Sequence, residues 1–522
     1  MMYKDVKGKW VADLGNGNYK NPILFADYSD PDVIRVGDDF FMVSSSFTYF
    51  PGMPVLHSKD LVNWKIISHA VEKMPFERYD KPQHGKGIWA PSIRFHDGKF
   101  YVYFGDPDLG IFMANTSDPF GKWNDVVCVK EAYGWIDPCP IWDDDGKAYL
   151  VHAFAKSRCG FKSRLAVSEM LPDGSKLIGE DIMVFDGRIN HPTIEGPKFY
   201  KKDGLYYILA PAGGVRTGWQ MAARSENIYG PYEHKIIMHQ GDSPINGPHQ
   251  GGLVDLDNGE SWFIHFQDIN AYGRVAHLQP AKWVDGWPFV GVDTNNDFVG
   301  EPVLEYKKPA VNCETQICTP ATSDDFNEKE LGLQWQWQAH ENKKFYELDG
   351  NVLKLFAMPV TDENGGEGFV SDAANLLSQL IQAPNFEAVT KVKLNLSEEG
   401  DTAGLTVTGG NYYCIRVENQ DGKFIIKQTN YEHSYPEHKE NVTETKEIEK
   451  VSEIYFKAVM EYNAQTDFYY SFDGIKYEKL GERVEYIVSR KSWVGGRIGL
   501  FCMNNKGKES SGFAEFEYID IK

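Results

Sequence analysis

The chain has 522 residues, of which 42% are apolar and 14% aromatic, and this length predicts two globular domains rather than one ordinary core. The net charge of −21 argues against nucleic acid and anionic membranes as partners, because both require basic surfaces. No run of ~18 apolar residues that could span a membrane occurs, and the first residues lack the apolar segment of a signal peptide. We therefore expect a cytoplasmic protein, with secretion as the alternative if a leader has been trimmed from the chain.

Cysteine usage agrees with a reducing compartment. The chain has 7 cysteines, an odd number, and none of them forms a CxxC pair. This spacing predicts neither a zinc site nor a disulfide framework, so free thiols are expected.

Five segments of the N-terminal part share one layout, in which a glycine-containing turn separates two short alternating apolar runs. Such turns are strong hairpin signals. A repeat of about 50 residues with three or four strands is typical of a propeller blade. We therefore predict a five-bladed β-propeller as the domain of residues 1–305. The turn glycines are Gly37, Gly98, Gly146, Gly204 and Gly259.

The residues that open the predicted inner strands are candidates for a functional site. Inner strands of a propeller surround a central channel, so their first residues should lie near one mouth of that channel. Three of the five are acidic, and like charges in a confined space raise at least one pKa. One carboxyl group is then protonated near neutral pH beside another that is ionised. In chain order the openers are Asp30, Ala90, Asp137, Glu195 and His249.

The C-terminal part has a different sequence pattern. Residues 306–322 lack strong periodicity and are predicted to form a linker. Residues 323–522 contain many short alternating runs, with turns at Gly409-Gly410, Asp421-Gly422 and Asp473-Gly474. This pattern predicts an antiparallel β-sandwich, and the fold class is therefore all-β.

Two carboxyl groups on either side of a bond suffice to hydrolyse a glycoside. Asp30 suits the general base, because the following proline fixes the backbone and Asp is the stronger acid. Glu195 suits the general acid, because its side chain is longer and its intrinsic pKa is higher. Asp137 would keep Glu195 protonated. Separate blades hold the base and the acid apart, which predicts inversion of configuration. For any single Asp-Pro pair, the alternative to a catalytic role is a structural turn.

Six motifs occur in order along the N-terminal part: Asn21-Pro22, Asp30-Pro31, Trp89-Ala90-Pro91, Ile136-Asp137-Pro138, residues 143–146 and Glu195-Gly196-Pro197. With these motifs the chain resembles glycoside hydrolase family 43, which comprises five-bladed propeller β-xylosidases and α-L-arabinofuranosidases. The resemblance implies Asp30 as general base, Asp137 as pKa modulator and Glu195 as general acid. The segments beginning at Ser323 and Leu331 resemble the jelly-roll, concanavalin-like sandwich of the xylosidase-type members.

The resemblance also implies substrate-binding residues. Phe47 and Trp89 correspond to rings around the bound sugar, with core packing as the alternative for both. Arg274 corresponds to an arginine that hydrogen-bonds sugar hydroxyls, with a surface arginine as the alternative. His249 corresponds to a histidine that helps to hold a central water cluster or a calcium ion. One histidine is a weak metal signal, since calcium prefers oxygen ligands, so we expect any ion to be bound through water and no cofactor to be required.

The leading hypothesis is an exo-acting, inverting glycosidase that releases terminal α-L-arabinofuranosyl residues from arabinoxylan-type oligosaccharides, with β-D-xylosyl residues as a further substrate. A dedicated β-xylosidase on xylo-oligosaccharides is the alternative within enzymes. A carbohydrate-binding propeller without catalysis is the alternative from another class, because aromatic-rich β domains also bind sugars.

Overall fold

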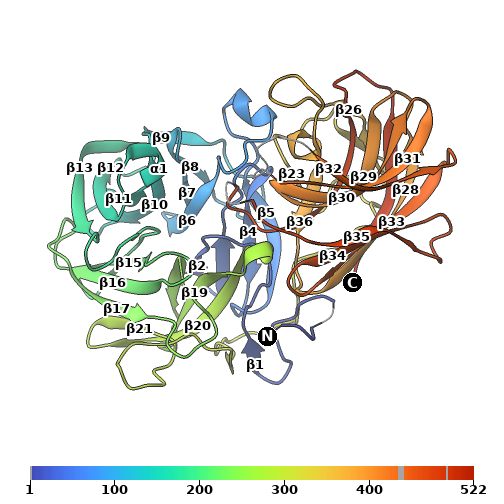
Figure 1. Cartoon of the computed structure of the whole chain (residues 1–522). Helices are drawn as coiled ribbons and strands as arrows, with labels where there is room; N and C mark the ends of the chain where they lie inside the picture. The colour runs from blue at the N-terminus through green and yellow to red at the C-terminus, as the bar shows by residue number, and fades with distance from the viewer. Residues whose placement is uncertain (1–2, 7, 433–439, 490–491) are drawn as a thin grey trace.

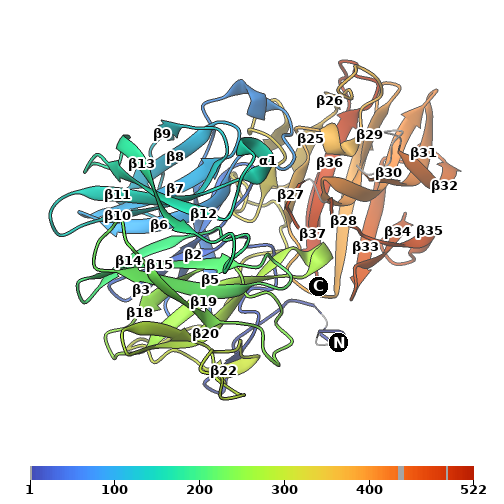
Figure 2. The ribbon, with the colours of Figure 1, turned by 60° about the vertical axis from the view of Figure 1, so that its left-hand side comes forward.

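The computed structural model describes residues 3–6, 8–432, 440–489 and 492–522. The protein is all-β, with a five-bladed propeller followed by a β-sandwich, and Figures 1 and 2 show the two parts side by side. The predicted fold class is therefore confirmed. No helix in the described residues is long and apolar enough to cross a membrane.

Each blade is an antiparallel sheet of four strands that follow one another in the chain, with the inner strand first. The first blade contains β2 (Asp32–Val36), β3 (Asp39–Val43), β4 (Gly52–Ser58) and β5 (Trp64–Val71). The second contains β6 (Trp89–His96), β7 (Lys99–Asp106), β8 (Gly110–Thr116) and β9 (Val127–Glu131). The third contains β10 (Trp135–Trp142), β11 (Ala148–Phe154), β12 (Arg164–Met170) and β13 (Leu177–Asp186). The last two contain β14 (Lys198–Lys202), β15 (Leu205–Ala212), β16 (Trp219–Ser225) and β17 (Glu233–Met238); and β18 (Gly251–Asp255), β19 (Ser261–Asp268), β20 (Arg274–Val284) and β21 (Trp287–Val290).

The predicted turn glycines connect the first two strands of every blade, and all five have positive φ angles between 61° and 86°. Nothing lies within 4 Å of a Cβ added at any of them, so glycine is favoured there by its backbone conformation and not by lack of space.

Contacts between distant parts of the chain close the ring of blades. Strand β1 (Asn18–Lys20) pairs with β22 (Glu305–Lys307). The Asn21 side chain donates to the carbonyl oxygens of Leu278 and Val303 and accepts from the Leu278 amide at 2.8 Å. The segment that carries Asp30 is thereby fixed against the fifth blade, and this positions the start of β2.

The sandwich consists of two packed sheets. One has, in spatial order, β24 (Tyr346–Leu348), β25 (Leu353–Phe356), β37 (Phe513–Ile521), β28 (Phe386–Asn395), β33 (Glu453–Glu461), β34 (Gln465–Ser471) and β35 (Glu478–Glu485). The other has β23 (Gln336–Trp337), β27 (Leu377–Leu380), β36 (Arg497–Asn504), β29 (Asp401–Gly409), β30 (Asn411–Gln420), β31 (Lys423–Tyr431) and β32 (Asn441–Ile448), with β26 (Met358–Pro359) parallel to β36. The short helices of the described residues are η1 (Glu77–Asp80), α1 (Lys156–Cys159), η2 (Asn270–Tyr272) and η3 (Val370–Asp372).

The sandwich is joined to the first blade by backbone hydrogen bonds. Phe50 and Trp337 exchange two of them, at 2.9 and 2.6 Å, and the His340 amide donates to the Tyr79 carbonyl at 2.7 Å. His84, whose role the sequence does not indicate, places Nε2 2.8 Å from the carbonyl oxygen of Ser371 in the sandwich. These contacts hold the two domains in one arrangement around the loop that follows β3.

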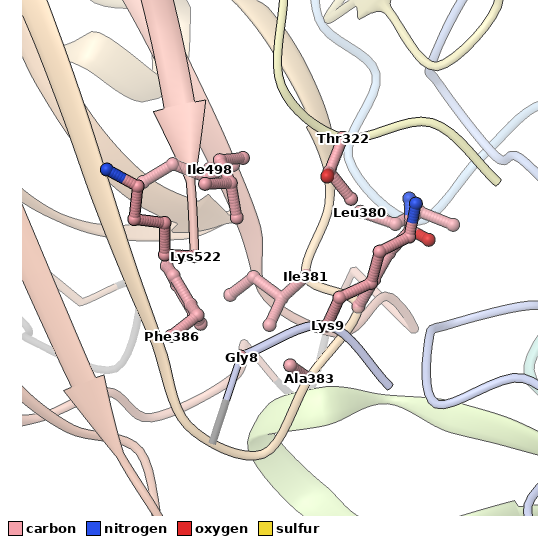
Figure 3. Close-up of a pocket in the computed structure, with 11 residues that line it drawn as sticks. Gly8, Lys9, Thr322, Leu380, Ile381, Ala383, Phe386, Ile498 and Lys522 are labelled. Carbon is pink, nitrogen blue, oxygen red and sulfur yellow. The ribbon is translucent and has the colours of Figure 1, made fainter. Parts of the chain in front are cut away.

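The first residues of the chain lie between the sandwich and the propeller, where the rings of Tyr3 and Trp10 also contact Phe25. Tyr3 and Trp10 belong to the hydrophobic cluster that contains the sandwich core. A cavity of about 10 Å³ remains between this segment and the sandwich, which is room for about one water molecule and not for a sugar. Figure 3 shows the side chains around it, from Lys9 and Thr322 to Leu380, Ile381 and Ile498.

Candidate active site

The backbone at the start of the inner strands has an unusual conformation. Asp30, Ala90 and Asp137 each precede a proline and have φ angles of 53°, 38° and 58°. Non-glycine residues rarely adopt such angles, and strained backbone of this kind concentrates at functional sites. In the fourth blade Gly196 takes this position, with a φ of 57°, and Glu195 lies one residue earlier. The sequence-based alignment of the openers was therefore off by one residue at Glu195.

Asp30 is held on both carboxyl oxygens. The hydroxyl groups of Ser29 and Ser45 each donate to Oδ2 at 2.7 Å, and Arg274 Nη1 lies 2.9 Å from Oδ1. Ser45 Oγ also accepts the Ala90 amide at 2.7 Å, which links the first two openers. The side chain of Asp30 is 9% exposed. This arrangement stabilises a carboxylate in one fixed orientation.

Asp137 and Glu195 form a coupled pair. Burial, and then the charge of Glu195, raise the pKa of Asp137 well above its usual range, while the Gly196 amide opposes this by donating to Oδ2 at 2.7 Å. The side chain of Glu195 is 36% exposed, so solvent reaches it. Desolvation by the surrounding protein nevertheless raises the pKa of Glu195 to about 7, an effect that the charge of Arg274 opposes and the charge of Asp30 reinforces. At neutral pH the pair therefore carries a proton.

His249 and Arg274 lie between the carboxyl groups of the first and fourth blades. His249 Nε2 is 3.5 Å from Glu195 Oε1, and burial, together with the charge of Arg274, lowers the pKa of His249 to about 3. His249 is thus neutral at neutral pH. The Arg274 guanidinium lies 4.9 Å from the ring centre of Phe266, which supports it opposite Asp30. The structure thus brings both predicted residues to the carboxylate site.

The two predicted aromatic residues contact each other beside this site. Phe47 and Trp89 are 6.1 Å apart with an edge-to-face geometry. Phe47 is almost fully buried, in a cluster with Tyr49 and Val494, whereas Trp89 is half-buried. Trp493, from the loop between β35 and β36 of the sandwich, packs on Trp89 at 6.3 Å and is 49% exposed. The sequence gives no signal for Trp493, because only the contact between the domains brings it here.

Several buried polar atoms near the carboxyl groups have no hydrogen-bond partner among the described residues. They are Trp89 Nε1, both ring nitrogens of His249 and Nε2 of Gln250. The Gln250 side chain lies directly against Gly196, where a Cβ would collide with it. Native proteins leave few such groups unpaired, and bound water or ligand hydroxyl groups commonly satisfy them. Gln250 was not anticipated, although it follows His249 directly in the chain.

A charged cluster joins the inner strands of the first four blades. Asp32 accepts from Arg94 Nη1 at 2.7 Å and lies 3.9 Å from Lys198 Nζ, and both charged partners are largely or fully buried. Arg94 Nη2 also lies 2.8 Å from the sulfur of Cys139. The thiol of Cys139 is thus a small packed group with a hydrogen-bonding role. The cluster fixes the strands that begin at the carboxyl groups.

The described residues contain no group of three or more His, Cys, Asp or Glu side chains arranged to hold a metal ion. The side chains around His249 therefore do not fit a protein-ligated ion, and no step of the chemistry is assigned to one.

Comparison with known proteins agrees with the fold and identifies the family. The sequence profile of "Glycosyl hydrolases family 43" matches residues 19–288, and that of "Beta xylosidase C-terminal Concanavalin A-like domain" matches residues 323–522. The chain therefore belongs to glycosyl hydrolase family 43. It is a glycosidase whose propeller carries the family's motifs and whose sandwich is the concanavalin-like domain, as the resemblance implied.

Individual relatives cover nearly the whole chain. A provisionally named β-xylosidase of Xylanibacter ruminicola is 39% identical over 95% of this chain and 88% of that protein. A non-reducing end α-L-arabinofuranosidase of Bacteroides ovatus is 30% identical over 99% of this chain and 97% of that protein. Among solved structures, a mutant of the family 43 protein BlXynB from Bacillus licheniformis is similar with a TM-score of 0.83 and 28% identity, covering 97% of this chain and 99% of that one.

Proposed function

We propose that this glycosidase is exo-acting and inverting, and that it releases terminal β-D-xylosyl residues from xylo-oligosaccharides. One observation carries the mechanism. A carboxyl group with a pKa of about 7, that of Glu195, faces the same site as a carboxylate fixed by Arg274, that of Asp30. These are the two states that a general acid and a general base require.

In this mechanism Asp30 accepts a proton from a water molecule, which attacks the anomeric carbon of the terminal sugar. Glu195 donates its proton to the glycosidic oxygen as the bond to the leaving sugar breaks. Burial and the charge of Asp30 raise the pKa of Glu195 to about 7, so its proton is available at neutral pH, and we assign Asp137, which is coupled to Glu195, the role of modulator. Because the base and the acid come from different blades, water has room on the face opposite the leaving group, and the configuration inverts.

The sugar-binding groups follow from the same geometry. Trp89, His249 and Gln250 present buried polar atoms that sugar hydroxyl groups could pair with, and the exposed ring of Trp493 offers an apolar face. Pyranose and furanose rings pack on such faces through their C–H groups. We propose that Phe47 supports Trp89 from behind rather than contacting the sugar with a large surface, since it is almost fully buried.

The choice of sugar rests on the relatives. Arabinofuranosides were the first expectation from the sequence. The Xylanibacter ruminicola relative has the higher identity and carries a β-xylosidase name, which favours xylosides. The α-L-arabinofuranosidase name of the Bacteroides ovatus relative keeps terminal arabinofuranosides as the second candidate. Rates on aryl β-D-xylosides and aryl α-L-arabinofuranosides, measured side by side, decide between them; a higher kcat/KM on the arabinofuranoside would reverse the order.

The acid assignment is tested with Glu195→Gln, which removes the proton donor and keeps the size of the side chain. Hydrolysis of xylobiose should fall by about 10³-fold, because its leaving sugar needs a proton. Hydrolysis of an aryl xyloside with a good leaving group should fall by less than about 10-fold. An equal loss on both substrates would reject Glu195 as the acid. Sugar binding by the wild-type chain without any release of reducing sugar would instead support the non-catalytic alternative.

A further inference from the structure

We propose that Asp27 is a positioning residue that fixes the sandwich loop carrying Trp493 and the propeller strand carrying Arg274 in one active arrangement. The inference rests on the proposed function, since it concerns the same site. Asp27 lies three residues before Asp30 and is 6% exposed. It touches neither the proposed acid nor the proposed aromatic contacts, so its effect is exerted through other residues.

The two carboxyl oxygens of Asp27 bind different domains. Oδ1 accepts the backbone amide of Arg274, at the start of β20, at 2.7 Å. Oδ2 accepts the backbone amide of Gly495, in the loop between β35 and β36, also at 2.7 Å. A single ionised side chain therefore joins the propeller and the sandwich through two short hydrogen bonds of the charge-assisted type.

The backbones on either side approach too closely for side chains. A Cβ on Gly273, whose φ angle is 72°, would collide with the carboxyl group of Asp27. A Cβ on Gly495 would lie 2.5 Å from the Gly273 amide nitrogen. The Gly496 amide donates to the Ala271 carbonyl at 2.7 Å, which extends this backbone contact. The glycines thus let the two chains meet where Asp27 can reach both.

Each hydrogen bond of Asp27 fixes one part of the site. The backbone of Arg274 sets the origin of the side chain that binds Asp30, the proposed base. Gly495 lies two residues after Trp493, which packs on Trp89. A shift of the Asp27 carboxylate would therefore move Arg274, the partner of the proposed base, together with the ring of Trp493.

The chemistry of the site requires a carboxylate and not an amide. Both partners are N–H donors, and Asn would offer one acceptor oxygen and turn its own NH₂ group towards the other donor. Burial raises the pKa of Asp27 to about 6, although the two amides and the charge of Arg274 oppose the rise. The other charged groups that act on it are Asp30 and, from the sandwich, Arg497. At neutral pH Asp27 is mainly ionised and can accept both bonds.

The test compares wild type, Asp27→Asn, Trp493→Ala and the double variant on two aryl xylosides with good and poor leaving groups. Asp27→Asn should lower kcat/KM by about 10²-fold on both substrates, with a loss in kcat itself, because a displaced base affects every substrate. The effects of Asp27→Asn and Trp493→Ala on log kcat/KM should be less than additive, since the first change already releases the loop.

A control separates positioning from general support of the interface. Asp80→Asn removes another carboxylate between the domains, which contacts His340 at 2.9 Å, and should leave kcat/KM within about 2-fold of wild type. Gly495→Ala serves as a second probe if Asp27→Asn does not fold, because the added methyl group displaces the same loop, and it should lower kcat/KM in the same way.

Four outcomes are decisive. Full kcat in folded Asp27→Asn, or strict additivity with Trp493→Ala, would overturn the inference while leaving the proposed function intact. If Gly495→Ala is the probe, an unchanged kcat/KM would likewise overturn the inference and leave the proposed function intact. A wild-type chain that cleaves neither aryl sugar would reject the proposed function itself.

Discussion

The first and fourth blades each deliver a carboxyl group to the site, and the protein surrounds the two groups in opposite ways. Asp30 receives hydrogen bonds from two serines and from Arg274 and is 9% exposed. Glu195 is 36% exposed, and its carboxyl group has no hydrogen bond among the described residues, only His249 at 3.5 Å. Hydrogen-bond donors fix the orientation of the Asp30 carboxyl group, while desolvation and the charge of Asp30 raise the pKa of Glu195.

The difference shows how one fold separates two chemically similar residues. The backbone conformation of the strand start is shared by Asp30, Asp137 and Gly196, so the repeat alone does not assign roles. The proposed roles of Asp30 and Glu195 follow from the side chains and backbone groups that surround each carboxyl group. Changes to these surroundings should therefore affect the two proposed roles unequally.

The largest effect is expected for Asp30→Asn, which keeps the shape of the side chain and removes the base. We expect kcat to fall by about 10⁴-fold on xylobiose and on aryl xylosides alike, because the attacking water must be activated by the base whichever group leaves. Single-turnover rates on the two substrates check this. A loss confined to xylobiose would mean that Asp30 and Glu195 have been assigned the wrong way round.

A smaller effect is expected for Arg274→Lys, which keeps the charge beside Asp30 and removes the planar guanidinium. Lysine cannot reproduce contacts to both Asp30 and Ser29 while packing on Phe266, so kcat/KM should fall by about 10²-fold, again independently of the leaving group. Steady-state kinetics on paired aryl xylosides measures it. Activity at the wild-type level would show that the orientation of Asp30 does not depend on Arg274.

The smallest effect is expected for Ser45→Ala, which removes one of the hydrogen bonds to Asp30 and the link to Ala90. A hydrogen bond to a charged group of this kind should change kcat/KM by about 10-fold. Ser44→Ala is the matched control, because Ser44 Oγ is buried without a hydrogen-bond partner in the described residues, and its loss should change kcat/KM by less than about 2-fold. Equal effects of Ser45→Ala and Ser44→Ala would show that kcat/KM depends on packing at this loop rather than on the hydrogen bond to Asp30.

Much of the propeller could be predicted from the sequence, because local rules and the global fold agree there. The turn at Gly204 requires a positive φ angle, and the alternating runs on both sides form β14 and β15 as expected. The start of blade four was placed one residue off, because the acid itself was aligned with Asp30 and Asp137. Gly196 precedes a proline as they do and adopts positive φ angles most readily, and this signal could have corrected the alignment.

The sandwich was predicted less completely, for a physical reason. Strands β32 and β35, each at the edge of its sheet, lie outside the alternating apolar runs on which the prediction of the sandwich rested. Their side chains are charged and mostly exposed, so they lack the apolar alternation that identifies a strand, and such charge protects an edge from further pairing. The contribution of Trp493 and the contacts of Asp27 were also beyond prediction, because both depend on how two domains meet.

The contrast between the two carboxyl groups is tested most directly by the pH dependence of kcat/KM for the wild-type enzyme on two aryl xylosides. Because Glu195 acts as an acid, it must be protonated, so activity on the substrate with the poor leaving group should fall as the pH rises through about 7. The substrate with the good leaving group needs no proton, and its alkaline limb near pH 7 should be absent. The same limb near pH 7 for both substrates would contradict the account.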